Sequence, residues 1–468
     1  MRRQDLRDVR APIAALIAGL AAVLASGCTL GPDYARPTID APATYRFDSP
    51  EARAARSLAD VSEWWTGFGD PDLDALVRET LAANHDLRIA TARVDEFAAR
   101  AGVTRAQGLP QVGYAAQAGR QDLGGGAIGN YSTGVSASWE LDLWGRIRRE
   151  NEAARADLFA TEEARRGVAL TLVSTVVSGY ITLLELDRSL AIAEATAAGR
   201  KKSVELFQMR LEGGAVSDFE MMQVTAEYEA ALAAIPDLRQ AVAQQENALS
   251  TLAGRNPGPI ARDRVLEALD APAIAPGLPS ALLERRPDIL QAEQQLVAAN
   301  ARIGVARTLY FPNIALTGSA GTASTQLEDL FSGPARIWSF SGQLLGPIFS
   351  GGAIESTNKQ IEAQHEQALE VYRATIQDAF RDVDDALVSL RETRELAAAL
   401  DRRVQALARA VELATLRYDN GAANYLDVLD AERSLFNAQL SLASARGDGY
   451  RAHVDLYRAL GGEWTKEE

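Results

Sequence analysis

Residues 302–307 read Arg-Ile-Gly-Val-Ala-Arg and repeat residues 100–105, which read Arg-Ala-Gly-Val-Thr-Arg. A second stretch, Arg-Tyr-Asp-Asn-Gly-Ala at 417–422, matches Arg-Leu-Glu-Gly-Gly-Ala at 210–215. Both landmarks keep their order in the two halves, so we infer an internal duplication with a period of about 200 residues. This period far exceeds the ~20–50 residues of solenoid repeats. The sequence therefore predicts two copies of a large supersecondary unit about a pseudo-symmetric axis.

The composition of the chain restricts its partners and its route across a membrane. A net charge of −15 over 468 residues would repel phosphate backbones, so no nucleic-acid partner is expected. No internal segment is expected to supply the ~18 or more uninterrupted apolar residues of a membrane-spanning helix. If the chain crosses a membrane, it must do so by another route.

Residues 1–27 have the pattern of an export signal, with an arginine-rich start and an apolar core. Leu-Ala-Ser-Gly then precedes Cys28, the sole cysteine, in a position similar to that of a bacterial lipobox. The pattern predicts cleavage and acylation of Cys28; the alternative is an ordinary secretory signal with an incidental cysteine. Thr29 follows in place of an aspartate, which is compatible with sorting to the outer membrane. Residues 28–69 are predicted to form an irregular, acylated tether.

Two long stretches without proline lie in equivalent places of the two halves and carry apolar residues at helical spacing. They predict helices over residues 147–211 and 353–418, which must pack side by side in a coiled-coil bundle or barrel. Each ends at a glycine-bearing turn, and helices over Asp218–Leu252 and Tyr425–Leu460 return from these turns. Pro236 is expected to interrupt and kink the first return helix.

A pattern with a period of two precedes each long helix. Val135, Ala137 and Trp139 alternate with polar residues, and Ile314 and Leu316 begin a similar pattern in the second half. Each half is therefore predicted to contribute one hairpin of strands about ten residues long, which suits tilted strands in a bilayer. The alternative is a pair of soluble hairpins packed on a helix. The export signal, together with the expected lack of any apolar helix long enough to span, favours the membrane.

Four strands cannot close a barrel, and an open edge in hydrocarbon leaves backbone groups unsatisfied. Several chains must therefore share one barrel, for which a dimer is the minimum and a trimer gives twelve strands. The predicted fold class is mainly α with a β-barrel segment. A helix, a β-hairpin, a long helix and a return helix are expected in a first repeat over residues 70–268 and a second over 269–461, with a C-terminal tail at 462–468.

A series of motifs extends over nearly the whole mature chain. They are Trp64-Trp65 with Phe68, Asp70 and Pro71; Trp139-Glu140-Leu141-Asp142-Leu143-Trp144-Gly145; Glu284-Arg285-Arg286-Pro287-Asp288-Ile289; Ala299-Asn300-Ala301 with Ile303-Gly304; Phe311-Pro312; and Gly346-Pro347-Ile348-Phe349 with Gly351-Gly352. In these motifs the chain resembles the TolC-like outer-membrane factor family, and within it the NodT-type efflux lipoproteins. The resemblance implies an internally duplicated fold whose trimer forms a 12-stranded β-barrel continued by a 12-helix periplasmic α-barrel.

The resemblance also implies a periplasmic gate just after the second tip turn. Asp427 and Asp430 would face the bore as two carboxylate rings, which attract cations. Tyr418 would hydrogen-bond a neighbouring helix, and Glu220 is the acidic counterpart in the first half. Ala423 departs from the best-known member of the family, which has an arginine at that place, so a charged latch is missing here. From spacing alone, the two aspartates are solvated residues near a helix N-terminus.

No catalytic constellation is found, so the chain is not predicted to be an enzyme, and no cofactor or metal is implied. The three histidines, His85, His365 and His453, are scattered along the sequence. Glu362 and His365 have the spacing of a helical metal site, but such sites need a second copy, and the first half has no equivalent histidine.

Sequence and resemblance together predict a passive exit channel at the cell outer membrane that extends into the periplasm and exports small molecules. Its expected partners are two further copies of the chain, a periplasmic adaptor (membrane-fusion) protein, an inner-membrane transporter of the resistance-nodulation-division class, and outer-membrane lipid. The adaptor would dock at the tip turns, at Gly213, Gly214 and Gly421, and splay the helices. Two alternatives stay open: a lipid-anchored coiled-coil spacer without a pore, and a duct for type I protein secretion.

Overall fold

The structure is a computed structural model that describes residues 29–47, 63–122, 124, 126–271 and 279–462. The predicted signal and Cys28 lie outside the described residues. The α-helices are α4 (Pro71–Ala83), α5 (His85–Gln107), α6 (Arg146–Glu212), α7 (Asp218–Leu252), α8 (Pro287–Thr308), α9 (Ala353–Asp419) and α10 (Tyr425–Ala459). The strands are β1 (Gln111–Asp122), β2 (Ala127–Glu140), β3 (Asn313–Ser324) and β4 (Arg336–Leu345). The 3-10 helices are η1 (Trp64–Phe68), η2 (Leu266–Ala268), η3 (Pro279–Glu284), η4 (Leu327–Asp329) and η5 (Gly333–Ala335).

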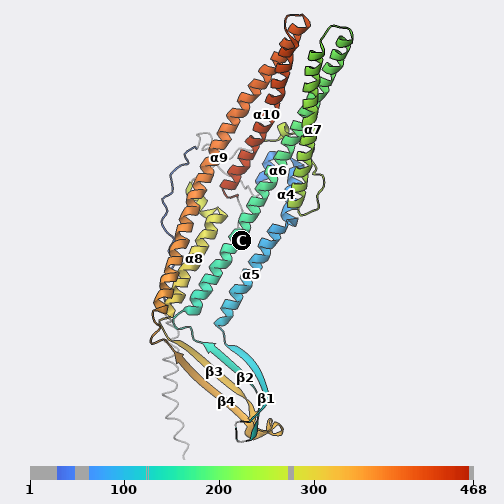
Figure 1. The fold of residues 1–468 in the computed structure, drawn as a ribbon. Helices are drawn as coiled ribbons and strands as arrows, with labels where there is room; N and C mark the ends of the chain where they lie inside the picture. Colours follow the sequence, from blue (N-terminus) through green and yellow to red (C-terminus); the bar gives the residue numbers. More distant parts are fainter. Residues whose placement is uncertain (1–28, 48–62, 123, 125, 272–278, 463–468) are drawn as a thin grey trace, which may run out of the picture. The chain divides into compact units, whose positions relative to one another are not determined.

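The same order of elements occurs twice along the chain: a helix, two strands, a long helix and a return helix. The long helices α6 and α9 have 67 residues each, and the return helices α7 and α10 have 35 each. Figure 1 shows α6 with α7, and α9 with α10, as two helical hairpins. The long helices lie where the proline-free stretches predicted them, and the return helices lie where the glycine-bearing turns predicted them.

The expectation that Pro236 interrupts the first return helix was wrong. α7 is continuous from Asp218 to Leu252 with Pro236 inside it. A proline removes one backbone donor and crowds the preceding turn, but it does not remove the contacts of the rest of the helix. Val224 and Ala231 are buried before Pro236 and Leu249 after it. Packing on both sides of the proline therefore keeps the helix intact.

The four strands form one antiparallel sheet in the order β1-β2-β3-β4 (Figure 1). Residues directly opposite one another point to the same face. Tyr114 pairs with Val135, Val135 with Ala320, and Ala320 with Trp338, so these side chains share one largely apolar face. The charged residues of this face lie at the end of the sheet away from the helices and are Arg120, Asp122 and Arg336. The predicted period of two is confirmed by this register.

The other face of the sheet is polar but almost without charge. Its polar side chains are Gln111, Gln117, Gln121, Asn130, Ser132, Ser136, Ser138, Asn313, Thr317, Ser319, Ser339, Ser341 and Gln343. In the strands, all of whose residues the structure describes, Glu140 is the one charged residue of this face. Glu140 lies at the end of β2 and accepts two hydrogen bonds from Arg146, at 2.9 and 2.8 Å.

The described chain divides into two compact units. The sheet unit comprises the described residues of 1–39, 92–163 and 291–374, and the hairpin unit those of 40–91, 164–290 and 375–468. In the sheet unit, the predicted tether has no helix or strand over 29–39. It is nevertheless bound, because the buried Arg149 donates to the carbonyl of Leu30 at 3.1 Å and to the carboxylate of Asp33 at 2.8 Å.

The core of the hairpin unit surrounds the apolar middle of α6. An 18-residue window of α6 has a mean hydropathy of 1.8, long and apolar enough to cross a membrane. The expectation that the chain holds no such segment was therefore wrong. However, 61% of that window is buried inside the structure. Val176, Tyr180 and Leu183 are fully buried there, so the window is a core segment of the hairpin unit.

Candidate functional site at the hairpin tips

The two tip turns have the same backbone geometry. In the first, the N–H of Gly214 donates to the carbonyl of Leu211 at 2.9 Å. In the second, the N–H of Gly421 donates to the carbonyl of Tyr418, also at 2.9 Å. Gly214 and Gly421 have φ values of 67° and 71°, in the left-handed region that favours glycine. Gly213, also predicted as a tip residue, precedes this position. Both turns therefore have one ordered backbone conformation at the positions where an adaptor was expected to dock.

Glu220 stabilises the start of α7 by a capping box. Its carboxylate accepts hydrogen bonds from the N–H and the hydroxyl of Ser217, at 2.8 and 2.9 Å, and the Ser217 hydroxyl caps the N–H of Glu220. These bonds from the backbone and hydroxyl of Ser217 lower the pKa of Glu220. The structure therefore gives Glu220 a local capping role, and its role in a gate stays a prediction.

An aromatic cluster joins the tips of the two hairpins. The ring of Phe207, on α6, lies 4.2 Å from that of Tyr425, on α10, between centroids. Tyr418, the last tyrosine of α9, lies 4.9 Å from Tyr425 and 6.3 Å from Phe207. Such separations are favourable for aromatic pairs. The buried residues around this cluster are Met221, Val224, Val428 and Leu429.

Arg210 is a residue of this site that the sequence did not reveal as functional. Its Nη1 donates to the hydroxyl of Tyr418 at 2.8 Å, which joins α6 to α9. Its guanidinium carbon lies 5.4 Å from the centroid of the Tyr418 ring and 5.8 Å from that of Phe207. The only signal was its place in the duplicated stretch. Its equivalent Arg417 binds the carbonyl of Ala422 in its own turn, so the duplication alone could not show the contact.

The two predicted gate aspartates are exposed and differ in their partners. Asp427 lies in the first turn of α10, where the helix dipole favours a carboxylate. Asp430 forms an ion pair with Arg433 one turn further on. Ala423 lies between the turn and α10 and is half-buried. The structure thus brings Tyr418, Asp427 and Asp430 to the tip of the second hairpin and Glu220 to the tip of the first.

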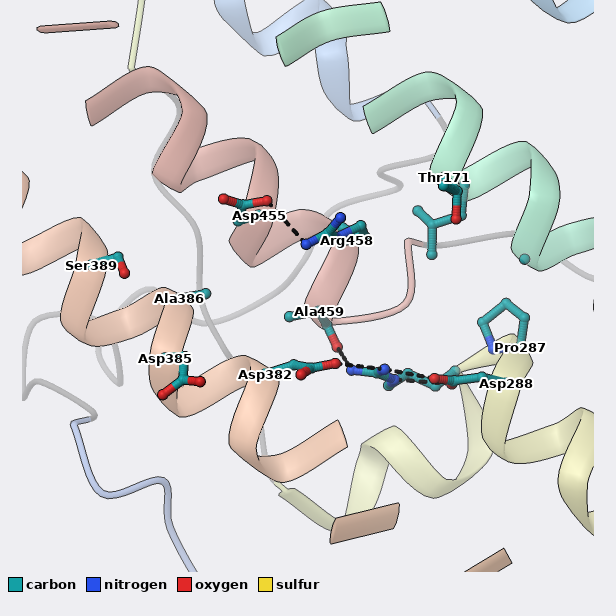
Figure 2. A pocket seen from close by; sticks show the side chains of 13 residues that line it. Thr171, Pro287, Asp288, Asp382, Asp385, Ala386, Ser389, Asp455, Arg458 and Ala459 are labelled. Atoms are coloured by element: carbon teal, nitrogen blue, oxygen red, sulfur yellow. Dashed lines mark hydrogen bonds and ion pairs between the residues drawn. The ribbon is translucent and has the colours of Figure 1, made fainter. Parts of the chain in front are cut away.

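A polar pocket of about 380 Å³ lies elsewhere in the hairpin unit, around Arg286 (Figure 2). The buried Arg286 donates to Asp288 at 3.0 and 2.6 Å, to Asp382 at 3.0 Å and to the carbonyl of Ala459 at 3.0 Å. These bonds join the start of α8 to α9 and to the end of α10. Each charge in the group has a partner, so we interpret this pocket as a structural junction.

The family model for outer membrane efflux proteins matches residues 76–255 and 278–462. The chain is 34% identical to the cation efflux system protein CusC of Escherichia coli K12, over 94% of this chain and 97% of the relative. It is 35% identical to the outer membrane protein OprJ of Pseudomonas aeruginosa, over 98% of each. It is also 34% identical to the toluene efflux pump outer membrane protein TtgC of Pseudomonas putida, over 95% of each.

Solved structures agree with these sequence matches. A crystal structure of CusC has a TM-score of 0.84 to this chain at 34% identity, covering 93% of this chain and 100% of that one. The open state of the Neisseria gonorrhoeae MtrE outer membrane channel also has a TM-score of 0.84, at 32% identity, covering 93% and 98%.

Proposed function

This chain belongs to the outer membrane efflux protein family, and from that premise we propose that it is the passive, trimeric exit duct of a tripartite efflux system. It is a channel of the TolC-like factors in the cell outer membrane. Small molecules are its cargo. They are delivered by an inner-membrane transporter of the resistance-nodulation-division class, which supplies the energy, through a periplasmic adaptor.

The faces and edges of the sheet are the observation that supports a trimeric pore. It has one apolar face, one polar face, and outer strands β1 and β4 that each pair with only one strand of the described chain. In hydrocarbon, both outer edges must find backbone partners. Three copies satisfy them when β4 of one copy pairs with β1 of the next, giving a barrel of about twelve strands. The apolar face then contacts lipid and the polar face lines the pore.

The hairpin tips form the periplasmic gate of this duct. Tyr418 and Arg210 link the two hairpins, and Asp427 and Asp430 supply carboxylates beside the second turn. Adaptor contacts at Gly213, Gly214 and Gly421 favour separated hairpins, and opening is then a shift of population between packed and separated states. Acylation of Cys28 anchors each copy to the outer membrane.

Small-molecule export is supported by the family and by two relatives, CusC and TtgC, whose names describe efflux. CusC is named for cation efflux and TtgC for toluene efflux, so the family serves chemically different cargo. We propose export of small toxic compounds for this chain, with the choice of cargo made by the pump.

The proposal is tested by deleting the gene and by recording from the purified trimer in planar bilayers. The deletion strain is expected to become sensitive to drugs or metals, and restoring the gene should restore resistance. The trimer should conduct. A protein that carries no current in bilayers would be a spacer, and loss of a secreted protein from the deletion strain without any change in sensitivity would indicate type I secretion.

A further inference from the structure

A layer of two charged residues, the buried Arg200 and the half-buried Glu432, lies two helical turns from the aromatic cluster, on the same helix faces. Arg200 precedes Phe207 by seven residues on α6, and Glu432 follows Tyr425 by seven residues on α10. Seven residues correspond to about two turns, which returns a side chain to nearly the same side of a helix. The seam between α6 and α10 therefore changes from aromatic at the tip to charged further along.

Arg200 belongs firmly to the first hairpin. Its side chain is 6% exposed, and its Nη2 lies 3.1 Å from the carboxylate of Glu227 on α7. Its Nη1 also donates to the backbone carbonyl of Glu227, at 2.5 Å. Its Nε has no hydrogen-bond partner among the described residues. A buried guanidinium with an unused donor is unfavourable unless further negative charge lies close to it.

The second hairpin supplies that charge. The guanidinium carbon of Arg200 lies 5.7 Å from the centroid of the Phe436 ring, on α10. One turn away on α10, one carboxylate oxygen of Glu432 is buried and has no hydrogen-bond partner in the described chain. Burial raises the pKa of Glu432; the charge of Arg200 opposes this shift and that of Glu227 adds to it. Glu432 and Arg200 thus face each other across the seam without a complete ion pair.

We infer that Arg200 and Glu432 form a charged layer that sets how readily the two hairpins separate when the channel opens. This inference rests on the proposed function as a gated duct. Charged side chains in such a seam contribute less to its stability than apolar side chains of similar volume, because the charges lose water on packing. The aromatic cluster holds the tips together, and the charged layer keeps the seam weak enough for a partner to open it. Arg200 acts as a positioning residue, since it need not touch the cargo.

The charged layer should also make opening of the channel depend on pH, with a higher pH favouring the open state. Glu432 is half-buried when the hairpins pack and gains water when they separate, so its pKa is higher in the packed state. Protonation therefore favours packed hairpins. As the pH rises and Glu432 ionises, the cost of keeping its charge buried favours separation. The charged groups acting on Glu432 are Arg200 from α6 and Glu227 from α7, and Tyr425 is its titratable neighbour on α10.

The test compares single-channel recordings of purified trimers. In the double variant Arg200→Leu with Glu432→Leu, an apolar seam should lower the open fraction about tenfold. Arg200→Ala removes the cation that offsets the charges of Glu227 and Glu432 and leaves Glu227 only Arg433, 3.9 Å away. The open fraction should therefore rise about tenfold, with partial rescue by Arg200→Lys. Lys201→Ala is the matched control, because Lys201 is the exposed neighbour of Arg200 on the same helix. It should leave the open fraction within about twofold of the unmodified channel.

Glu432→Gln keeps the shape of the side chain and provides a variant that should fold normally. The unmodified channel should open more as the pH is raised from about 5 to about 8, whereas Glu432→Gln should stay at the low value throughout. Identical pH profiles for the two, or an unchanged open fraction in the double leucine variant, would overturn the inference and leave the proposed function intact. An unmodified trimer that carries no current would instead overturn the proposed function itself.

Discussion

At the scale of single residues, one polar contact within an apolar cluster connects the tips of the two helical hairpins. The bond between Arg210 and Tyr418 connects α6 to α9 across 208 residues of sequence. The best-known member of the family that the sequence resembles has an arginine where this chain has Ala423. Arg210 therefore supplies, from the first hairpin, a cation at the tyrosine that was predicted to hold the gate.

Removing this contact should loosen the gate. Arg210→Ala and Tyr418→Phe are each expected to weaken the link between the hairpins by about 1 kcal/mol and to raise single-channel conductance. Because the two groups bind each other, the double variant should show little more than one single change. Arg417→Ala is the matched comparison, since Arg417 binds only within its own turn. Fully additive effects would show that the two side chains act independently.

The two aspartates should differ in their influence on ion selectivity. Asp427 lies in the first turn of α10 and forms no ion pair with any described residue, whereas Arg433 offsets the charge of Asp430. We therefore expect Asp427→Ala to reduce the preference for cations more than Asp430→Ala does. Reversal potentials in a salt gradient measure this preference. If single-channel currents and reversal potentials are unaltered in both variants, these aspartates have no role in the gate.

At the scale of helices and strands, the sequence predicted what depends on local chemistry. The proline-free stretches and the glycine turns located α6, α7, α9 and α10 within a few residues, because helix ends are set by local backbone preferences. The effect of Pro236 was not predictable in this way, since packing at Val224, Ala231 and Leu249 outweighs one lost hydrogen bond. Arg200 and Arg210 were missed because their partners come from distant helices.

Variants at the start of α7 can show whether Glu220 is a cap, a gate residue or both. Ser217→Ala should lower the stability of the first hairpin by about 1 kcal/mol, measured as a lower thermal midpoint of the trimer. Since the pKa of Glu220 is lowered in the folded chain, its contribution is complete above its unfolded pKa and is lost as the pH falls.

The same experiment separates the two roles of Glu220. Glu220→Gln keeps a weaker hydrogen-bond acceptor, so its midpoint should lie between those of the unmodified protein and Ser217→Ala. A change in conductance without any change in the midpoint would instead assign Glu220 to the gate.

At the scale of the whole molecule, the two faces of the sheet define the assembly. The apolar face can be covered by lipid, while the polar face needs water, and only a closed barrel provides both. The trimer could not be derived from the residues alone, because four strands per chain set only a minimum number of copies for a closed barrel and not the actual number. The family supplied that number.

Two neighbouring residues of β4 provide a matched test of the assembly. Phe340 lies opposite Gly318 on the apolar face, and Ser341 lies opposite Thr317 on the polar face. Phe340→Arg should disfavour insertion by about 2–4 kcal/mol per copy, as for a cation facing the middle of a bilayer. Ser341→Arg should insert normally and shift selectivity toward anions. Heat-resistant trimer on gels and bilayer recordings measure the two outcomes; equal insertion of both variants would contradict the assigned faces.

The nearly neutral polar face of the sheet has a consequence for the compounds that leave by this route. Hydroxyl and amide groups solvate acids, bases and zwitterions alike, and Glu140, already paired with Arg146, adds little discrimination. If the polar face lines the pore as proposed, a change in the ionisation state of a small molecule should therefore not slow its passage through the part of the pore that the sheet forms. Escape from efflux has to be designed against the pump that loads the duct.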